Sequence, residues 1–442
     1  MPPVLPDSLA RLLSLLRGGF TAPTFDTFCW LVHGFVGRIG EHTITGVWQA
    51  ARLGGVFHHS RAHDFFARRR WSPDRLGLWL CEFVVTCFIG GEEAIGIAVD
   101  DTLFTRTGRK VFGASWMFEQ TPPKGRTTPK FGYGNSFVCL GILVRLRDSQ
   151  RTVCLPLLFR LWRAGEGAPT KVDLAHELIG LVAARFARRR IELVADSYYA
   201  TRKLATLPEN VTACVSVRSN SAFWAPPPKP SRRYRGRPRK RGQRIGSVRE
   251  LVAAPQTRWR ELRLLHNGQE QLSEIHSFDG VWFKVLNDQA VRVVILRHPQ
   301  REDRPILAVL CTNHSLTPAE IVSRYADRWA IETAFAEAKG QLGVGEARNR
   351  VQPAVERTVP FGFLCRAIVI VWYTLHGNAQ EDLDRRLKIA PWYRQKRLPA
   401  FADMLLALRR ELIRAEFRHG LHNRPTRQKI EYLAITTLSL AS

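Results

Sequence analysis

The stretch Arg324–Gln341 reads RYADRWAIETAFAEAKGQ, and we predict that it forms a single helix around which the fold is organised. At 3.6 residues per turn, four of its polar or charged side chains fall on one narrow stripe of the helix. These are Tyr325, Arg328, Glu332 and Lys339. The neighbouring stripe is apolar, so the helix can pack on a sheet while the polar row faces a cleft. The alternative is a solvated helix face on which Arg328 and Glu332 form an ordinary ion pair.

Both ends of this helix carry sequence signals. Thr317 is placed to be the N-cap residue, Pro318 follows at the first helical position, and Glu320 completes a capping box. Gly340 and Gly343 mark the end of the helix. The pattern therefore predicts a helix that begins after Thr317 and ends near Gly343.

The composition points to a polyanionic partner. The chain has 442 residues with 66 Lys and Arg against 39 Asp and Glu, a net charge of +27. Such an excess favours binding to nucleic acid first and to an anionic membrane second. Hydrophobic residues make up 45% of the chain, which is ample for packed cores in more than one domain.

Neither a membrane nor an oxidising compartment is indicated. The eight cysteines show no CxxC spacing, which favours reduced thiols rather than disulfides or a zinc finger. No secretory signal is visible at the N-terminus, and Arg366 interrupts the longest apolar run, Val359–Leu375, so we expect a buried helix there. The sequence predicts a cytoplasmic protein of bacterial type with no membrane partner.

The hydrophobic period changes along the chain. Residues 1–90 have helical spacing, which is equally typical of a DNA-binding module and of a structural helical cap. The pattern then predicts a strand that ends at Asp100, a hairpin, a helix, and a strand that ends at Asp196. The ranges are 94–99, 137–146 with 152–161, 172–188 and 191–195. Ligands bind at the carboxyl ends of strands in open sheets, so these two aspartates are candidate site residues.

Two aspartates at neighbouring strand ends, together with Glu332 on a packed helix, would form an anionic pocket with oxygen ligands only. Such a pocket suits Mg²⁺ or Mn²⁺, and two ions about 3.5–4 Å apart can promote in-line cleavage of a phosphodiester. Arg328 and Lys339 would then bind phosphates, and Tyr325 a backbone oxygen. The alternative is that each aspartate is a turn or cap residue, with Asp196 as the N-cap of a following helix.

At these residues the sequence resembles bacterial insertion-sequence transposases of the DDE class, whose catalytic core is RNase H-like. Tyr325, Arg328, Glu332 and Lys339 reproduce the Tyr-x2-Arg-x3-Glu-x6-Lys signature of one large branch in every position. The stretches Val99–Thr102 and Leu193–Tyr199 resemble the first and second acidic motifs. The resemblance implies Asp100, Asp196 and Glu332 as catalytic metal ligands. Asp101 is the alternative to Asp100. Adjacent residues of a strand point to opposite faces, so only one of the two can be the main ligand.

The long separation between Asp196 and Glu332 implies an insertion, and related transposases carry a β-rich one at this place. Within it Arg232–Arg244 is densely basic, so we expect a loop along a DNA backbone or, alternatively, a solvated loop. The candidate DNA-binding residues here are Arg232, Arg233, Arg235, Arg237, Arg239, Lys240 and Arg241. The ranges 259–265, 281–286, 291–296 and 306–311 are predicted strands. Trp282 or Phe283 would stack on an unpaired base or, more commonly, pack in a core.

The predicted fold class is α/β, an RNase H-like core with a mixed sheet, a β-rich insertion and helical N-terminal and C-terminal regions. Five segments are expected. They are 1–90 (helical, DNA-binding), 91–217 (core, first part), 218–305 (insertion), 306–376 (core, second part) and 377–442 (helical tail).

The resemblance implies a cut-and-paste transposase that uses two Mg²⁺ or Mn²⁺ ions for DNA cleavage and strand transfer. Its expected partners are the terminal inverted repeats, target DNA and a second copy of the chain, with the protein bound to the nucleoid when it holds DNA. A catalytically inactive DNA-binding regulator and an RNase H-like nuclease without strand transfer are the alternatives.

Overall fold

The structure is a computed structural model that describes residues 2–118, 131–146, 151–228, 240–266, 269–298 and 306–421. The chain forms two compact units. Unit 1 comprises Met1–Gly91, Asp101–Ala168 and Ile331–Ser442, and unit 2 comprises Glu92–Asp100 and Pro169–Ala330. Unit 1 thus groups the N-terminal helices with the hairpin and the C-terminal helices. The predicted division into five functional segments stays a prediction.

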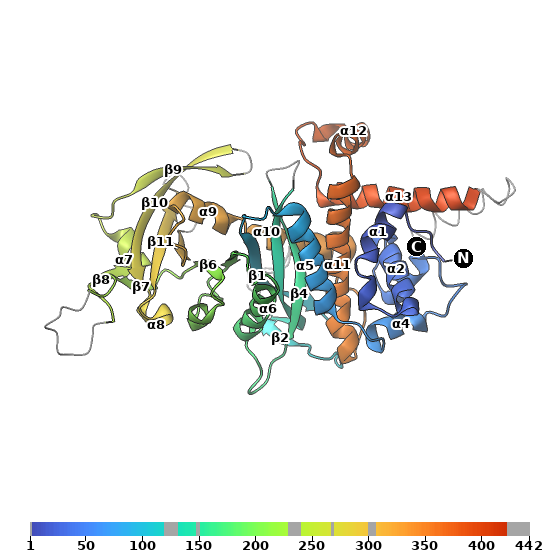
Figure 1. Cartoon of the computed structure of the whole chain (residues 1–442), viewed down its shortest axis with the longest axis horizontal. Helices are drawn as coiled ribbons and strands as arrows, with labels where there is room; N and C mark the ends of the chain where they lie inside the picture. Colours follow the sequence, from blue (N-terminus) through green and yellow to red (C-terminus); the bar gives the residue numbers. More distant parts are fainter. Residues whose placement is uncertain are drawn as a thin grey trace. The chain divides into compact units, whose positions relative to one another are not determined.

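The first 90 residues are helical, as the periodicity predicts. The helices are α1 (Asp7–Ser14), η1 (Arg17–Gly19), α2 (Ala22–Gly37), α3 (Ile44–Ala50), α4 (Ser60–Ala67) and α5 (Pro73–Phe88). Helix α5 begins with Pro73 at its first position, and the Ser72 hydroxyl accepts a hydrogen bond from the Arg75 amide at 3.3 Å. These helices pack around α11 (Gln352–His376), which runs through the middle of the helical part of unit 1 (Figure 1).

Helix α11 is long and apolar enough to cross a membrane by length and composition, but 89% of its most apolar window is buried inside the protein. It is therefore the central core helix of unit 1, as the interruption by Arg366 predicts. Helices α12 (Ala379–Ile389), η3 (Pro391–Tyr393) and α13 (Phe401–Leu421) follow it. Helix α13 packs on α11 and on α2.

The sheet of unit 1 contains the predicted hairpin. Strands β3 (Phe131–Arg145) and β4 (Thr152–Trp162) pair antiparallel, with Arg145 opposite Thr152. The predicted turn residues 147–150 lie outside the described residues. Strand β3 also pairs with β2 (Ser115–Phe118) and neighbours β1 (Ile95–Thr105).

The strands of unit 2 follow β1 in the strand order. This order is β1-β5-β6-β12-β11-β10-β7-β8, with β9 paired to β10. Strand β5 (Ile191–Ala195) is parallel to β1 and to β6 (Val211–Ser216), whereas β6 and β12 are antiparallel, and α6 (Lys171–Arg185) precedes β5. The remaining elements are η2 (Arg202–Thr206), β7 (Ala222–Trp224), β8 (Arg244–Ser247), α7 (Val248–Ala253), β9 (Arg260–His266), β10 (Gln269–Val281), α8 (Phe283–Leu286), β11 (Ala290–Arg297), β12 (Leu307–Cys311) and α9 (Pro318–Ala326).

The predicted fold class is confirmed. Parallel strands joined through α6 and an antiparallel hairpin after β1 give the mixed sheet of an RNase H-like core, and β7 to β11 form the β-rich insertion. Helical regions lie at both ends of the chain. The capping box at Thr317 is also confirmed, because Thr317 and Glu320 exchange side-chain and backbone hydrogen bonds.

The prediction of a single helix over Arg324–Gln341 is wrong. The structure has two helices, α9 and α10 (Trp329–Leu342), separated at Asp327 and Arg328. The Asp327 amide bonds to the Ser323 and Arg324 carbonyls, and the Arg328 amide bonds to the Tyr325 carbonyl. Bonds over three residues tighten the turn and end the regular α-helix there.

Two strand predictions also need correction. Strand β1 does not end at Asp100 but continues to Thr105; only its parallel pairing with β5 stops, at Val99 opposite Ala195. The range 281–286 is not a strand, because β10 ends at Val281 and α8 follows. An apolar run of this length has the same pattern in a helix and in a strand, so periodicity does not separate the two.

Candidate active site

Asp100 and Asp196 lie next to each other in strand register in unit 2. The parallel strands β1 and β5 pair up to Val99 and Ala195, and each aspartate is the next residue of its chain. The Asp196 side chain accepts a hydrogen bond from the Tyr198 amide at 2.9 Å, which forms an Asx turn. No α-helix follows directly among the described residues, so the alternative of Asp196 as a helix N-cap is wrong. The register thus places the two acidic residues at adjacent positions of neighbouring strands, as the sequence indicates, while their role as site residues stays a prediction.

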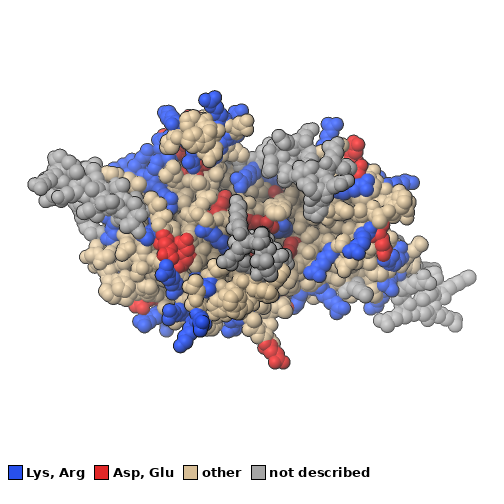
Figure 2. Space-filling model, turned by 180° about the vertical axis from the view of Figure 1, so that it is seen from behind, with Lys and Arg blue, Asp and Glu red and all other residues tan. Residues whose placement is uncertain are grey.

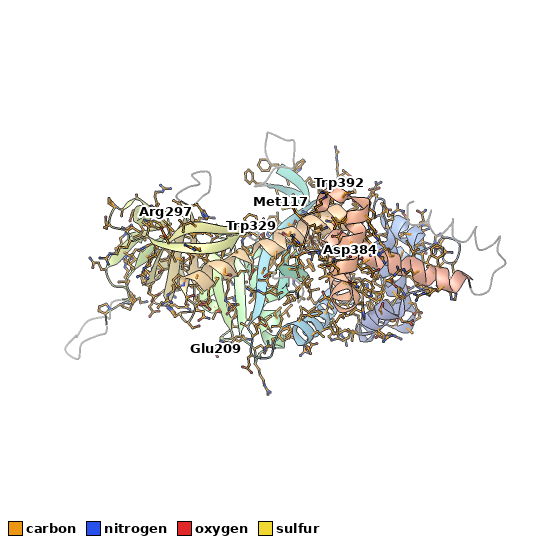
Figure 3. All side chains as sticks on the ribbon, turned by 90° about the horizontal axis from the view of Figure 1, so that it is seen from above. Met117, Glu209, Arg297, Trp329, Asp384 and Trp392 are labelled. Atoms are coloured by element: carbon orange, nitrogen blue, oxygen red, sulfur yellow. The ribbon has the colours of Figure 1, made fainter. Side chains whose placement is uncertain are left out.

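Arg328 is the charged group that the structure brings to Asp100. Its guanidinium lies 3.5 Å from the Asp100 carboxylate, and the side chain of Arg328 is only 10% exposed. The guanidinium carbon also lies 5.1 Å from the ring centre of Trp329, which is 60% exposed (labelled in Figure 3). The break between α9 and α10 thus turns the Arg328 cation inward, toward Asp100 of β1, and the Trp329 ring outward.

Asp101 faces a different partner. The Ser136 hydroxyl of β3 donates a hydrogen bond to the Asp101 carboxylate at 3.3 Å, within unit 1. Adjacent residues of a strand point to opposite faces, so we expect Asp100 and Asp101 on different faces of β1. Asp100 is paired with Arg328, one of the two cations of the signature row.

Lys339 is held against β1 in unit 1. Its ammonium donates to the Thr102 hydroxyl at 2.6 Å and to the Leu103 carbonyl at 2.8 Å. Thr102 lies two residues after Asp100 and therefore on the same face of β1. The contact fixes the face of α10 that carries both Lys339 and Glu332, because these residues are seven apart on the helix.

Glu332 lies half-buried in the first turn of α10 in unit 1. The apolar stripe predicted beside it is confirmed, since Ile331, Ala334, Phe335, Ala338 and Leu342 are all buried. Tyr325 is buried as well, with 6% exposure. The hydrogen bond predicted from Tyr325 to a DNA backbone oxygen would therefore involve a side chain that is largely covered by protein.

One ion pair near the site has no counterpart in the sequence prediction. Arg324 of α9 binds Glu192 of β5, which holds the helix on the strand that leads to Asp196. Burial raises the pKa of the Glu192 carboxyl, and the neighbouring Arg324 opposes this rise. In the sequence, Glu192 follows the apolar Ile191, and this alternation predicts a polar position on the strand. It does not identify Arg324 as the partner of Glu192.

An open cavity of about 450 Å³ lies directly beyond Asp196 in unit 2. Its lining includes Ser197, Tyr198, Arg218, Trp224 and Trp282. Trp282 is half-buried, so part of its side chain stays accessible and it is not sealed in a core. Phe283 begins α8. Arg218 and Trp224 were not candidates from the sequence, because neither belongs to a periodic or motif pattern.

The basic loop of the insertion is described only in part. Arg232, Arg233, Arg235, Arg237 and Arg239 lie outside the described residues, whereas Lys240 and Arg241 are described and exposed. The Arg241 guanidinium lies 4.7 Å from the ring centre of Trp224 and 4.9 Å from that of Phe283. The end of the basic loop is thus attached to the aromatic groups around the cavity.

The acidic side chains fit a hard divalent cation by their chemistry. Asp100 and Asp196 offer carboxylate oxygens from adjacent strands of unit 2, and Glu332 offers another from unit 1. Oxygen-only ligands suit Mg²⁺ or Mn²⁺ rather than zinc. Among the described residues, no group of three or more His, Cys, Asp or Glu side chains is already gathered around one point. The convergence of all three acids stays a prediction.

Comparison with known proteins gives a family and structural similarities. Residues 16–271 match a family described as DDE superfamily endonuclease, a range that contains Asp100 and Asp196 and ends before Glu332. No match was found among curated proteins. A solved structure of the piggyBac transposase synaptic complex with hairpin DNA is similar with a TM-score of 0.44 and 12% identity, over 98% of this chain and 81% of that chain.

Proposed function

Because the chain belongs to the DDE superfamily of endonucleases, we propose that it is a transposase of the insertion-sequence type. It would cleave the ends of a DNA element and join them to target DNA, most simply by cut-and-paste. The observation that carries this proposal is the register of Asp100 and Asp196 at adjacent parallel strands, with Arg328 at 3.5 Å from Asp100. The Tyr-x2-Arg-x3-Glu-x6-Lys row adds Glu332 as the third acid.

We propose Asp100 rather than Asp101 as the first-strand ligand. Asp100 shares its face of β1 with Thr102, which binds Lys339 of α10, whereas Asp101 binds Ser136 of β3. Asp100, Asp196 and Glu332 would hold two Mg²⁺ or Mn²⁺ ions. When bound, such ions activate a water and stabilise the leaving oxygen of a phosphodiester.

The residues of this chain would position the DNA. Arg328 lies beside Asp100, where a guanidinium can bind a phosphate next to the scissile bond. The cavity beyond Asp196, with Arg218, Trp224 and Trp282, has the volume and the lining to take a nucleotide of the DNA end. Lys and Arg are spread widely over the face drawn in Figure 2, which suits a partner with many phosphates.

The partners and location follow from this role. We propose terminal inverted repeats and target DNA as substrates, a homodimer on paired DNA ends, and a cytoplasmic protein bound to the nucleoid. The basic segment Arg232–Arg244 would lie along a DNA backbone. The alternatives are a regulator that binds DNA without cleavage and a nuclease without strand transfer.

A matched pair of variants tests the assignment of the first acid. Asp100→Asn should abolish nicking of supercoiled DNA that carries the element ends, because the substitution removes a charged oxygen ligand and preserves shape. Asp101→Asn changes the neighbouring residue in the same way and should retain most of the activity. Equal activity of Asp100→Asn and wild type would contradict the proposal, and loss only in Asp101→Asn would exchange the two roles.

A further inference from the structure

The loop between α12 and α13 exposes large apolar side chains. We call residues 388–398, KIAPWYRQKRL, the Trp392 loop. In this loop Ile389 is 74% exposed, Trp392 76% and Tyr393 47% (Trp392 is labelled in Figure 3). Contiguous exposed apolar groups of this size mark interaction sites in soluble proteins. The loop lies in unit 1, and it carries none of the proposed catalytic residues.

The Trp392 loop is held in one conformation by a buried carboxylate. The side chain of Asp403 is 4% exposed and accepts hydrogen bonds from the Ala400 amide at 2.8 Å, from Arg386 at 3.0 Å and from Lys396. Burial raises the pKa of Asp403, but Lys396, Ala400 and Arg386 together outweigh burial and hold the pKa below its ordinary value. The Asp403 carboxylate, which we call the anchor of the loop, therefore stays ionised and holds Arg386 before the loop and Ala400 after it.

Backbone bonds stiffen the centre of the loop. The Tyr393 amide bonds to the Ala390 carbonyl at 3.1 Å, and the Lys396 amide bonds to the Tyr393 carbonyl at 3.0 Å. The rings of Trp392 and Tyr393 are tilted by 45° with centres 6.2 Å apart, so they do not stack on each other. An exposed ring on an ordered backbone loses little conformational freedom when it binds a ligand.

The charges of the Trp392 loop indicate which class of partner it binds. No acidic residue lies between Asp384 and Asp403, and that interval holds six Arg and Lys residues. Asp403 neutralises part of this charge through Arg386 and Lys396. Lys388, Arg394 and Arg397 are exposed, and no ion pair is recorded for them within the described part of the chain. Aromatic rings among unneutralised cations fit bases and phosphates, whereas a second copy of the same loop would repel it.

We propose that the Trp392 loop binds DNA in which bases are unstacked, as in a single-stranded gap or a distorted junction. Trp392 and Tyr393 stack on the bases, while Arg394 and Arg397 bind the adjoining phosphates. Intact duplex hides the faces of its bases, so the loop discriminates in favour of unpaired strands. This inference rests on the proposed function only in taking DNA as the partner, because the loop is separate from the proposed catalytic residues.

The test compares binding of the full-length protein to a gapped duplex and to the same duplex without a gap, by fluorescence anisotropy. Trp392→Ala should weaken binding to gapped DNA about tenfold and leave binding to intact duplex nearly unchanged. Trp392→Phe keeps a ring and should restore most of the affinity. Arg394→Gln/Arg397→Gln should flatten the dependence of log affinity on log salt by about 1.4 for the single strand.

A charge-matched control separates local from general electrostatics. Arg414→Gln/Arg418→Gln removes the same charge from exposed positions of α13 and should leave the preference for gapped DNA intact. Near-UV circular dichroism checks that each variant is folded; the Arg394/Arg397 variant alters only exposed side chains and supplies the test if Trp392→Ala does not fold.

The proposal is overturned if wild type binds gapped and intact DNA equally, or if folded Trp392 and Arg394/Arg397 variants keep the wild-type preference. A change in the sedimentation mass of the protein without a change in DNA affinity would also overturn it and identify the loop as a contact between copies. Nicking of end DNA is scored separately. Normal nicking with an unaffected gap preference refutes this inference alone, whereas a loop-dependent preference without any nicking refutes only the transposase proposal.

Discussion

Replacing Glu337 by Leu should destabilise unit 1 strongly, because it leaves a buried arginine without its counter-ion. Arg366 lies in the middle of α11 with 2% exposure of its side chain, and its guanidinium binds the Glu337 carboxylate of α10 at 2.5 Å and 3.2 Å. It also donates to the Cys154 carbonyl of β4 at 2.8 Å. The pair joins three elements of unit 1, one of which carries Glu332.

The magnitude follows from burial. Glu337→Leu removes two charge-assisted hydrogen bonds, each worth about 1.5–3 kcal/mol, and breaking a buried pair from one side costs about 3–5 kcal/mol in total. The double variant Glu337→Leu/Arg366→Met removes both charges and should recover most of this loss. Glu411→Gln breaks an exposed pair with Arg414 on α13 and should cost less than about 1 kcal/mol.

Hydrogen exchange of the α10 and α11 amides measures the free energy of opening of this part of unit 1, without requiring that both units unfold together. Exchange should accelerate by a factor that corresponds to about 3–5 kcal/mol in Glu337→Leu and by much less in the double variant. A loss below about 1 kcal/mol, or a double variant as unstable as the single one, would refute the reasoning.

Three further outcomes are expected. Gly77→Ala should destabilise α5 because a Cβ atom there would lie 2.1 Å from the Leu157 carbonyl, whereas Gly180→Ala in α6 meets nothing within 4 Å and should stabilise by about 1 kcal/mol; thermal unfolding compares the two. Burial lowers the pKa of His33 to about 4, so the unfolded chain takes up the proton first, and His33 should contribute a fall of about 1.4 kcal/mol per pH unit to the free energy of unfolding as the pH drops from 6.5 toward 4; in denaturant titrations the slope should be smaller by this amount in His33→Leu. Replacing the Arg and Lys residues of Arg232–Arg244 by Gln should weaken binding to all DNA sequences alike and flatten its salt dependence, and an unchanged slope would indicate a solvated loop.

Local signals in the sequence predict the elements well. The bounds of β5 match the predicted strand, and the caps at Ser72 and Thr317 form as their residue types indicate. These features depend on neighbours within a few residues, which the sequence displays directly. The parity of a strand also separates Asp100 from Asp101 before any contact is known.

The errors arise where distant contacts decide the local structure. Helical periodicity continues through Asp327 and Arg328, but the helix is interrupted there, and the Arg328 guanidinium lies beside Asp100, which is far away in the sequence. The contact between Lys339 and Thr102 likewise joins segments that no local pattern connects. The carboxylate anchor of the Trp392 loop follows that loop in sequence, and only the structure identifies its partners.

Glu332→Gln, assayed for DNA nicking and DNA binding in parallel, tests the central claim most directly. The amide preserves the size of the side chain and the helix but removes the charge that a metal ligand requires. With Mg²⁺ and DNA carrying the element ends, nicking should be lost almost completely while the gel-shift affinity stays at the wild-type value. Wild-type nicking by Glu332→Gln would contradict the proposed catalytic role of Glu332.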